Sequence, residues 1–234
     1  MTKPLSPAVR LAILAGAAAL VAGAMMLTQA IPPVVGLGER VRLPIFHGAS
    51  TWVNMGTLTI LGVVALAYLL LRAPRLYAWV AGFRFVGAGM WIANMVLGGL
   101  AAKLTWDFTG SPASPLVIAQ ADPRLMVQLQ LVLLVAALLV AGWLIESDRW
   151  RAVMDVAFVA VMWAMLGSVL MSPEARALHP DNPVMNSGPE IQTPFFAILA
   201  ALSLAILLLV VLVQDQVARS RQAKASAMAA TTAD

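Results

Sequence analysis

The chain has 234 residues, of which 61% are apolar and 11% are charged, and it contains no cysteine. This balance is typical of an integral membrane protein, and the lack of cysteine excludes disulfides, thiolate metal sites, a thiol nucleophile and the C-x-x-C-H motif for covalent haem. The formal net charge of +4 comes from basic residues at segment boundaries rather than from a basic run, so nucleic acid is not an expected partner.

Apolar segments follow one another along the chain, and each is long enough to cross the hydrocarbon core as a helix of about 20 residues. They are residues 11–30, 52–71, 78–102, 125–145, 152–171 and 194–214. No strand-like alternation appears, so we predict an all-α integral membrane bundle of six transmembrane helices in contact with lipid. The bundle is expected to cover residues 1–218, and a polar tail to cover 219–234. The first segment resembles a secretory signal in its small terminal residues, but its length and the following Pro32-Pro33 favour a retained helix.

The basic residues are distributed unequally between the two sets of loops. One set, with the termini, carries Lys3, Arg10, Arg72, Arg75, Arg149, Arg151, Arg219, Arg221 and Lys224, and the other carries Arg40, Arg42, Lys103, Arg124 and Arg176. The richer side is expected to be cytoplasmic, so we predict a multi-pass protein of the cell inner membrane with both termini inside. The outer loops are the longer ones, which favours a functional site on the outer face.

Two histidines are present in the whole chain, His47 before the second segment and His179 after the fifth. Two neutral imidazoles from different segments suit axial ligation of haem iron, because a planar macrocycle needs one ligand on each face. In the loop between them, Trp106 could stack on a porphyrin, and Lys103 and Arg124 could meet its propionates. The alternative is that each histidine is an ordinary interfacial residue. Because the two are predicted at the same membrane boundary, we favour a shared site.

These motifs resemble a known family. The chain reads "IFHGASTW" at 45–52, "WD" at 106–107 and "DPRL" at 122–125, with a second histidine after the fifth segment. This pattern is similar to the cytochrome c assembly proteins, the haem-handling membrane proteins of the CcmC and CcsA type. The resemblance implies haem b as cofactor, and a periplasmic haem chaperone or other cytochrome c maturation subunits as partners. The residues it assigns to the haem site are His47, His179, Trp106, Asp107, Asp122 and Arg124.

The expected function is therefore that of a haem-binding component of cytochrome c biogenesis, which holds and presents haem at the outer face without catalytic residues. The loop departs from the family pattern, since Trp106 stands alone and an apolar, Pro-rich insert separates "WD" from "DPR". Two alternatives stay open: a membrane anchor for electron transfer through b-type haem, and a cofactor-free structural subunit. The absence of histidines within the predicted helices counts against the first of these.

Polar residues also occur inside the apolar segments. Arg84 and Asp155 would each cost several kcal/mol if left unpaired in lipid. We expect Arg84 to reach toward the cytoplasmic interface and Asp155 to pair with Arg151, and the alternative is an inner ion pair or a proton-path element. Asn94 predicts a hydrogen bond between helices.

Overall fold

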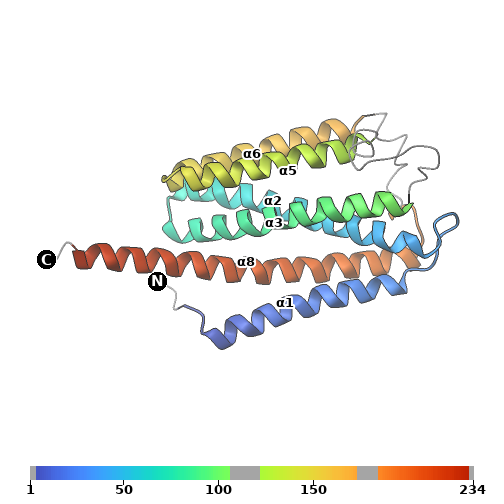
Figure 1. Ribbon diagram of the computed structural model, residues 1–234, viewed down its shortest axis with the longest axis horizontal. Coiled ribbons are helices and arrows are strands. Elements are labelled where there is room, and N and C mark those ends of the chain that lie inside the picture. The colour runs from blue at the N-terminus through green and yellow to red at the C-terminus, as the bar shows by residue number, and fades with distance from the viewer. Residues whose placement is uncertain (1–3, 106–121, 173–183, 232–234) are drawn as a thin grey trace.

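The structure, a computed structural model, describes residues 4–105, 122–172 and 184–231 (Figure 1). Its helices are α1 (Pro7–Leu27), α2 (Arg42–Leu71), α3 (Pro74–Thr105), α5 (Pro123–Leu144), α6 (Asp148–Leu170) and α8 (Pro189–Thr231), and two short 3-10 turns, Thr28–Ala30 and Glu39–Val41, join α1 to α2. Within these ranges six helices are long and apolar enough to cross a membrane. The predicted all-α six-helix bundle is confirmed for the described residues, and the chain is a multi-pass membrane protein.

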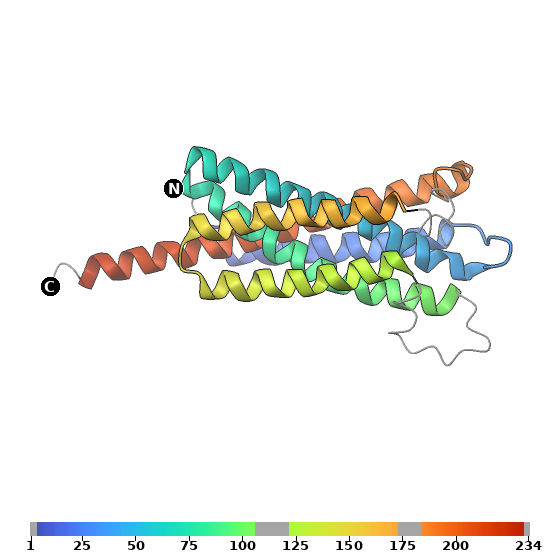
Figure 2. The same cartoon turned by 90° about the horizontal axis from the view of Figure 1, so that it is seen from above.

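The helices run alternately up and down and pack in layers (Figures 1 and 2). Helix α8 contacts α1 on one side and α2 and α3 on the other. Helices α5 and α6 pack on each other, α5 also packs on α3, and α6 also packs on α2. Helix α1 begins and α8 ends at one end of the bundle, which we call the terminal end; the α2–α3 and α5–α6 turns also lie there. The opposite end, where α2 begins, is called the His47 end.

Local sequence explains where the helices begin and end. The Ser6 hydroxyl accepts a hydrogen bond from Val9 N and the Ser147 hydroxyl accepts one from Trp150 N, as expected of helix N-caps. Helices α1 and α5 each carry a proline in the first turn, where the missing N–H costs nothing. Helix α2 ends at Leu71, because the next residue, Arg72, has a left-handed φ of 51° that stops the helix before the short turn into α3.

Two helix boundaries lie far from those predicted, one at the start of α2 and one at the end of α8. Helix α2 begins at Arg42 rather than at 52, because the polar side chains of its first turns find hydrogen-bond partners that hydropathy does not register. Helix α8 continues past 214 to Thr231, through the segment predicted as a tail. The added residues are mostly good helix formers. An ion pair four residues apart, Arg219 Nε to Asp215 Oδ2 at 3.0 Å, supports this extension.

Close helix packing in the core depends on glycine at specific points. Gly62 of α2 lies against Val159 of α6, and a Cβ added at Gly62 would be 2.9 Å from Val159 Cγ1. Gly87 of α3 lies against Leu58 of α2, where an added Cβ would be 2.7 Å from Leu58 Cδ2. Small residues at such contacts let membrane helices approach closely. These contacts hold α2 between α3 and α6.

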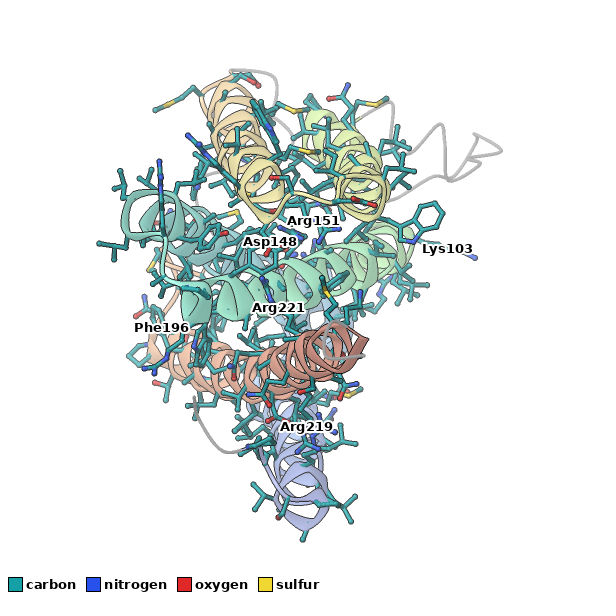
Figure 3. All side chains as sticks on the ribbon, turned by 90° about the vertical axis from the view of Figure 1, so that its left-hand side faces the viewer. Lys103, Asp148, Arg151, Phe196, Arg219 and Arg221 are labelled. Carbon is teal, nitrogen blue, oxygen red and sulfur yellow. The ribbon has the colours of Figure 1, made fainter. Side chains whose placement is uncertain are left out.

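Charged side chains tie the helices together at the terminal end, which Figure 3 views directly. Asp148, at the start of α6, accepts from Arg221 of α8 at 2.5 Å and lies 3.5 Å from Arg151. The guanidinium of Arg221 also lies over the ring of Tyr77 in α3, 4.8 Å from its centroid. This cluster connects three helices where α8 leaves the bundle.

Candidate functional site

His47 lies within the second turn of α2 and is half-buried. The sequence predicted it just before the helix, and the earlier start of α2 corrects that position. Its ring faces α3, where Nδ1 lies 3.1 Å from Oδ1 of Asn94. The side chain is therefore part of the packing between two helices at the His47 end, not of a surface loop.

Asn94 is the centre of a hydrogen-bond network between α2 and α3. It is 4% exposed, and the predicted interhelical hydrogen bond is confirmed. Its Nδ2 donates to Thr51 Oγ1 at 2.8 Å, and its Oδ1 accepts from Ser50 Oγ at 2.5 Å. The Thr51 hydroxyl donates to the backbone oxygen of His47 at 2.9 Å, and Ser50 Oγ lies 2.8 Å from the same oxygen. One buried amide thus meets the histidine ring and both hydroxyls that follow it on α2.

Gly98, one turn after Asn94 on α3, provides the surface against which the His47 ring packs. A Cβ added at Gly98 would lie 2.9 Å from His47 Cε1, 3.1 Å from His47 Nε2 and 3.4 Å from Gln128 Oε1. Gln128 Oε1, from α5, is buried and has no hydrogen-bond partner among the described residues. An unsatisfied buried acceptor is costly, so its position beside a histidine ring calls for a functional explanation. The Nε2 edge of the His47 ring therefore lies close to the backbone of α3 at Gly98 and to the side-chain amide of Gln128 from α5.

The row of polar side chains that begins with His47 continues along α2 toward the bundle interior. Asn54 is fully buried, and with its amide oriented to satisfy both atoms it donates to Gly87 O at 3.1 Å and accepts from Trp91 N at 3.0 Å. His47, Asn54 and the two hydroxyl residues between them occupy positions i, i+3, i+4 and i+7, which is one face of a helix. This face was not predicted from the sequence, because three of its four residues lie before the predicted start of the helix at residue 52.

Asp122 and Arg124 lie at the beginning of α5, also at the His47 end. Asp122 is 1% exposed and caps the helix, with Oδ1 accepting from Arg124 N at 2.8 Å. Asp122 therefore acts as the N-cap of α5, the helix that carries Gln128. Lys103, the other cation proposed for propionates, is exposed near the end of α3.

The remaining predicted site residues, His179, Trp106 and Asp107, lie outside the described residues. The second axial ligand and the front of the haem loop therefore stay predictions. Within the described ranges, no group of three or more His, Asp or Glu side chains could hold a metal ion directly.

Arg84 and Asp155 do not behave as expected. The predicted pairing of Asp155 with Arg151 is wrong: Asp155 accepts from Arg84 Nε at 2.7 Å and from Arg84 Nη2 at 2.5 Å. Arg151 instead lies near Asp148 and the Tyr77 hydroxyl. The alternative of an inner ion pair is correct, because α3 and α6 are close enough for the guanidinium to reach the carboxylate without leaving the core.

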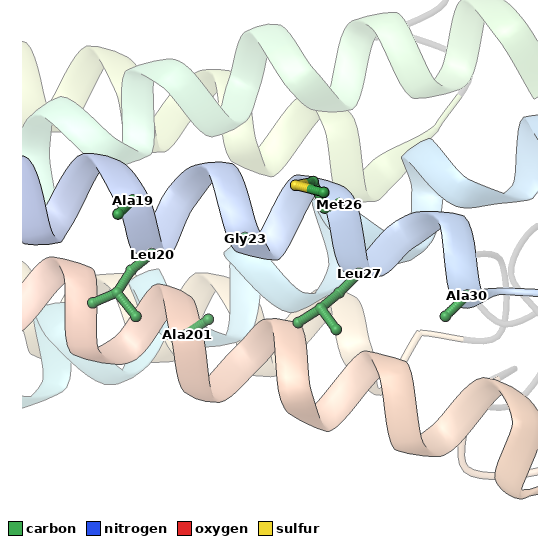
Figure 4. Close-up of a pocket in the computed structure, with 7 residues that line it drawn as sticks. All are labelled: Ala19, Leu20, Gly23, Met26, Leu27, Ala30 and Ala201. Carbon is green, nitrogen blue, oxygen red and sulfur yellow. The ribbon is translucent and has the colours of Figure 1, made fainter.

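An apolar groove of about 510 Å³ runs between α1 and α8 (Figure 4). It is lined by Ala19, Leu20, Gly23, Met26, Leu27, Ala30 and Ala201. No lining side chain can donate or accept a strong hydrogen bond, so nothing there would orient a polar ligand. We therefore place the candidate site at His47.

The sequence matches no protein-family model and no curated protein. The site is therefore interpreted from its own geometry and from the sequence motifs that led to it.

Proposed function

We propose that this chain binds haem b at the His47 end and presents it at the outer face of the membrane, as a component of cytochrome c biogenesis. The observation that supports this most is the contact between His47 and Asn94, in which Nδ1 of the ring lies 3.1 Å from the side-chain oxygen Oδ1. Metal-ligating histidines commonly donate their second ring N–H to a carbonyl or carboxylate, which orients the ring. His47 Nε2 would then be the nitrogen that ligates iron.

The residues around His47 fit such a group. Gly98 has no side chain beside the ring, and Gln128 Oε1 is a buried acceptor a few ångströms away. When bound, haem supplies an iron whose axial ligands can exchange, which is the chemistry that a delivery protein needs. The chain would hold the imidazole in place, surround it with apolar helices and keep the site near the end of the bundle.

The rest of the proposal comes from the resemblance to cytochrome c assembly proteins. His179 would supply the second axial ligand, Trp106 would lie beside the macrocycle and Arg124 would lie near a propionate. Asp107 would stand at the front of the haem loop and Asp122 at its end. A periplasmic haem chaperone would receive the haem. Two histidine ligands would give a low-spin centre, and exchange of either one would permit release.

An absorption spectrum of the purified protein, before and after haem loading, tests the proposal. We expect a Soret band with low-spin character. His47→Ala or His179→Ala should weaken retention or shift the band, and the double substitution should abolish binding. An unchanged Soret band and haem content in the double variant would overturn the proposal. No Soret band after loading would also overturn it, in favour of a cofactor-free structural subunit.

A glycine pair on α3 provides a matched steric test. Gly98→Ala adds a methyl group against the His47 ring, whereas Gly99→Ala adds one where nothing lies within 4 Å. Overpacking of this kind costs about 1–3 kcal/mol, so haem affinity should fall roughly tenfold or more in the Gly98 variant. The Gly99 variant should bind haem like the parent protein. Equal affinity in the two variants would place the haem away from this edge of His47.

A further inference from the structure

We propose that Asn94 is a positioning residue that fixes the tautomer of His47, with the proton on Nδ1 and the lone pair on Nε2. Only the consequence for iron rests on the proposed function. The tautomer itself is a property of the haem-free protein and follows from hydrogen-bond directions between α2 and α3.

The orientation of the Asn94 amide follows from its contact with Thr51. The Thr51 hydroxyl uses its one proton to donate to the backbone oxygen of His47 at 2.9 Å, so it meets Asn94 as an acceptor. Its partner at 2.8 Å must then be the Nδ2 amide group of Asn94. This places Oδ1 on the other side of the amide, facing His47.

The Asn94 oxygen determines which ring nitrogen of His47 carries the proton. An amide oxygen accepts hydrogen bonds and cannot donate them, so at 3.1 Å from Oδ1 the Nδ1 of His47 must carry the proton. The opposite tautomer would set two lone pairs against each other. With Oδ1 in this position, Ser50 Oγ at 2.5 Å donates its one proton to Oδ1, so its 2.8 Å contact with the backbone oxygen of His47 carries no proton.

Burial strengthens the hydrogen bond between Asn94 and His47. Asn94 is 4% exposed, so water does not compete well for its amide. Breaking a hydrogen bond in such a place leaves a buried polar group unsatisfied, which costs more than the same loss at the surface. Free histidine in water favours the proton on Nε2. The contact with Asn94 therefore reverses the usual preference and leaves the lone pair on Nε2.

The haem-free protein tests this inference directly. In a His179→Ala background His47 is the only histidine, so ¹⁵N-histidine labelling gives one imidazole in the NMR spectrum. At alkaline pH we expect Nδ1 to show the shift of a protonated nitrogen and Nε2 that of an unprotonated one. Asn94→Leu should move the proton largely to Nε2, whereas Asn94→Asp, which keeps an acceptor, should leave it on Nδ1.

Asn54→Leu serves as the control, because it removes another buried amide at the same helix interface without a contact to His47. It should leave the tautomer unchanged. A parent spectrum with the proton on Nε2 would overturn the inference, as would an Asn94→Leu spectrum identical to the parent. Elution volume and melting temperature in detergent identify folded variants, and Asn94→Asp provides a second comparison if Asn94→Leu does not fold.

Haem binding separates this inference from the proposed function. Loss of an outer hydrogen-bond partner commonly lowers metal affinity about 10–100-fold, so Asn94→Leu should lose haem by such a factor and Asn94→Asp should retain it. If the tautomer responds as expected but the parent protein binds no haem, the proposed function fails and the role of Asn94 stands. If haem binding requires His47 but the tautomer is reversed, the role of Asn94 fails and the proposed function stands.

Discussion

Arg84 of α3 and Asp155 of α6 form a two-pronged ion pair inside the apolar bundle, with N–O distances of 2.7 and 2.5 Å. The side chain of Arg84 is 5% exposed and that of Asp155 is fully buried. Removing water from two charges is expensive, and the paired geometry offsets much of that cost. The pair joins the α5–α6 hairpin to the rest of the helices.

Breaking this pair should destabilise the protein strongly. Asp155→Asn leaves a buried guanidinium without its counter-charge, so we expect the free energy of unfolding to fall by about 3–5 kcal/mol. Unfolding in detergent or bicelles measures it. The double variant Arg84→Met with Asp155→Leu should be much less damaged, since it removes both charges together. Arg149→Met, at an exposed position, is the control and should change stability little. A double variant as unstable as Asp155→Asn would contradict the argument.

Gly62 should tolerate no side chain. Gly62→Ala places a Cβ 2.9 Å from Val159 Cγ1 and 3.1 Å from Val159 Cβ, so α2 and α6 must move apart. We expect a loss of about 1–3 kcal/mol in unfolding free energy. Gly56→Ala on the same helix meets nothing within 4 Å and should stabilise by about 0.5–1 kcal/mol, because alanine is the better helix former. Similar melting temperatures for the two variants would show that α2 and α6 are not in close contact.

Arg221 should hold the extension of α8 against the terminal end. It pairs with Asp148 at 2.5 Å and lies over the Tyr77 ring, so Arg221→Ala removes two contacts at once. We expect faster amide hydrogen exchange after Asp215 and unchanged exchange in the membrane part of α8. Lys224→Ala, at an exposed position on the same helix, is the control. High salt should reproduce part of the effect in the parent protein, because exposed ion pairs are screened.

The orientation predicted from the basic residues can be tested with single cysteines, since the chain has none of its own. Val35 is fully exposed at the His47 end, and Met228 is 72% exposed on the extension of α8. An impermeant thiol reagent should label Val35→Cys in intact cells and Met228→Cys only after lysis. The reverse pattern would place the His47 end in the cytoplasm and would exclude a periplasmic haem site there.

Much of the fold could be predicted from sequence because hydropathy is a local property. A run of apolar residues long enough to cross the bilayer must satisfy its backbone within itself, which leaves a helix as the outcome. The six segments and their alternating direction were therefore readable from the sequence. The start of α2 was not, because Arg42, His47 and Ser50 lower the hydropathy of turns that packing against α3 stabilises.

Hydropathy along the chain was enough to predict the six membrane-spanning helices found in the described residues, and the scarcity of histidine singled out the candidate ligands. Which polar groups meet could be known only from the folded molecule: Asn94 with His47, Gly98 with the ring edge, and Arg84 with Asp155 rather than Asp155 with Arg151. Such pairings depend on how each helix is rotated about its axis and how far it is shifted along its neighbour. Both are set by side-chain packing over several helices at once, which no single segment records.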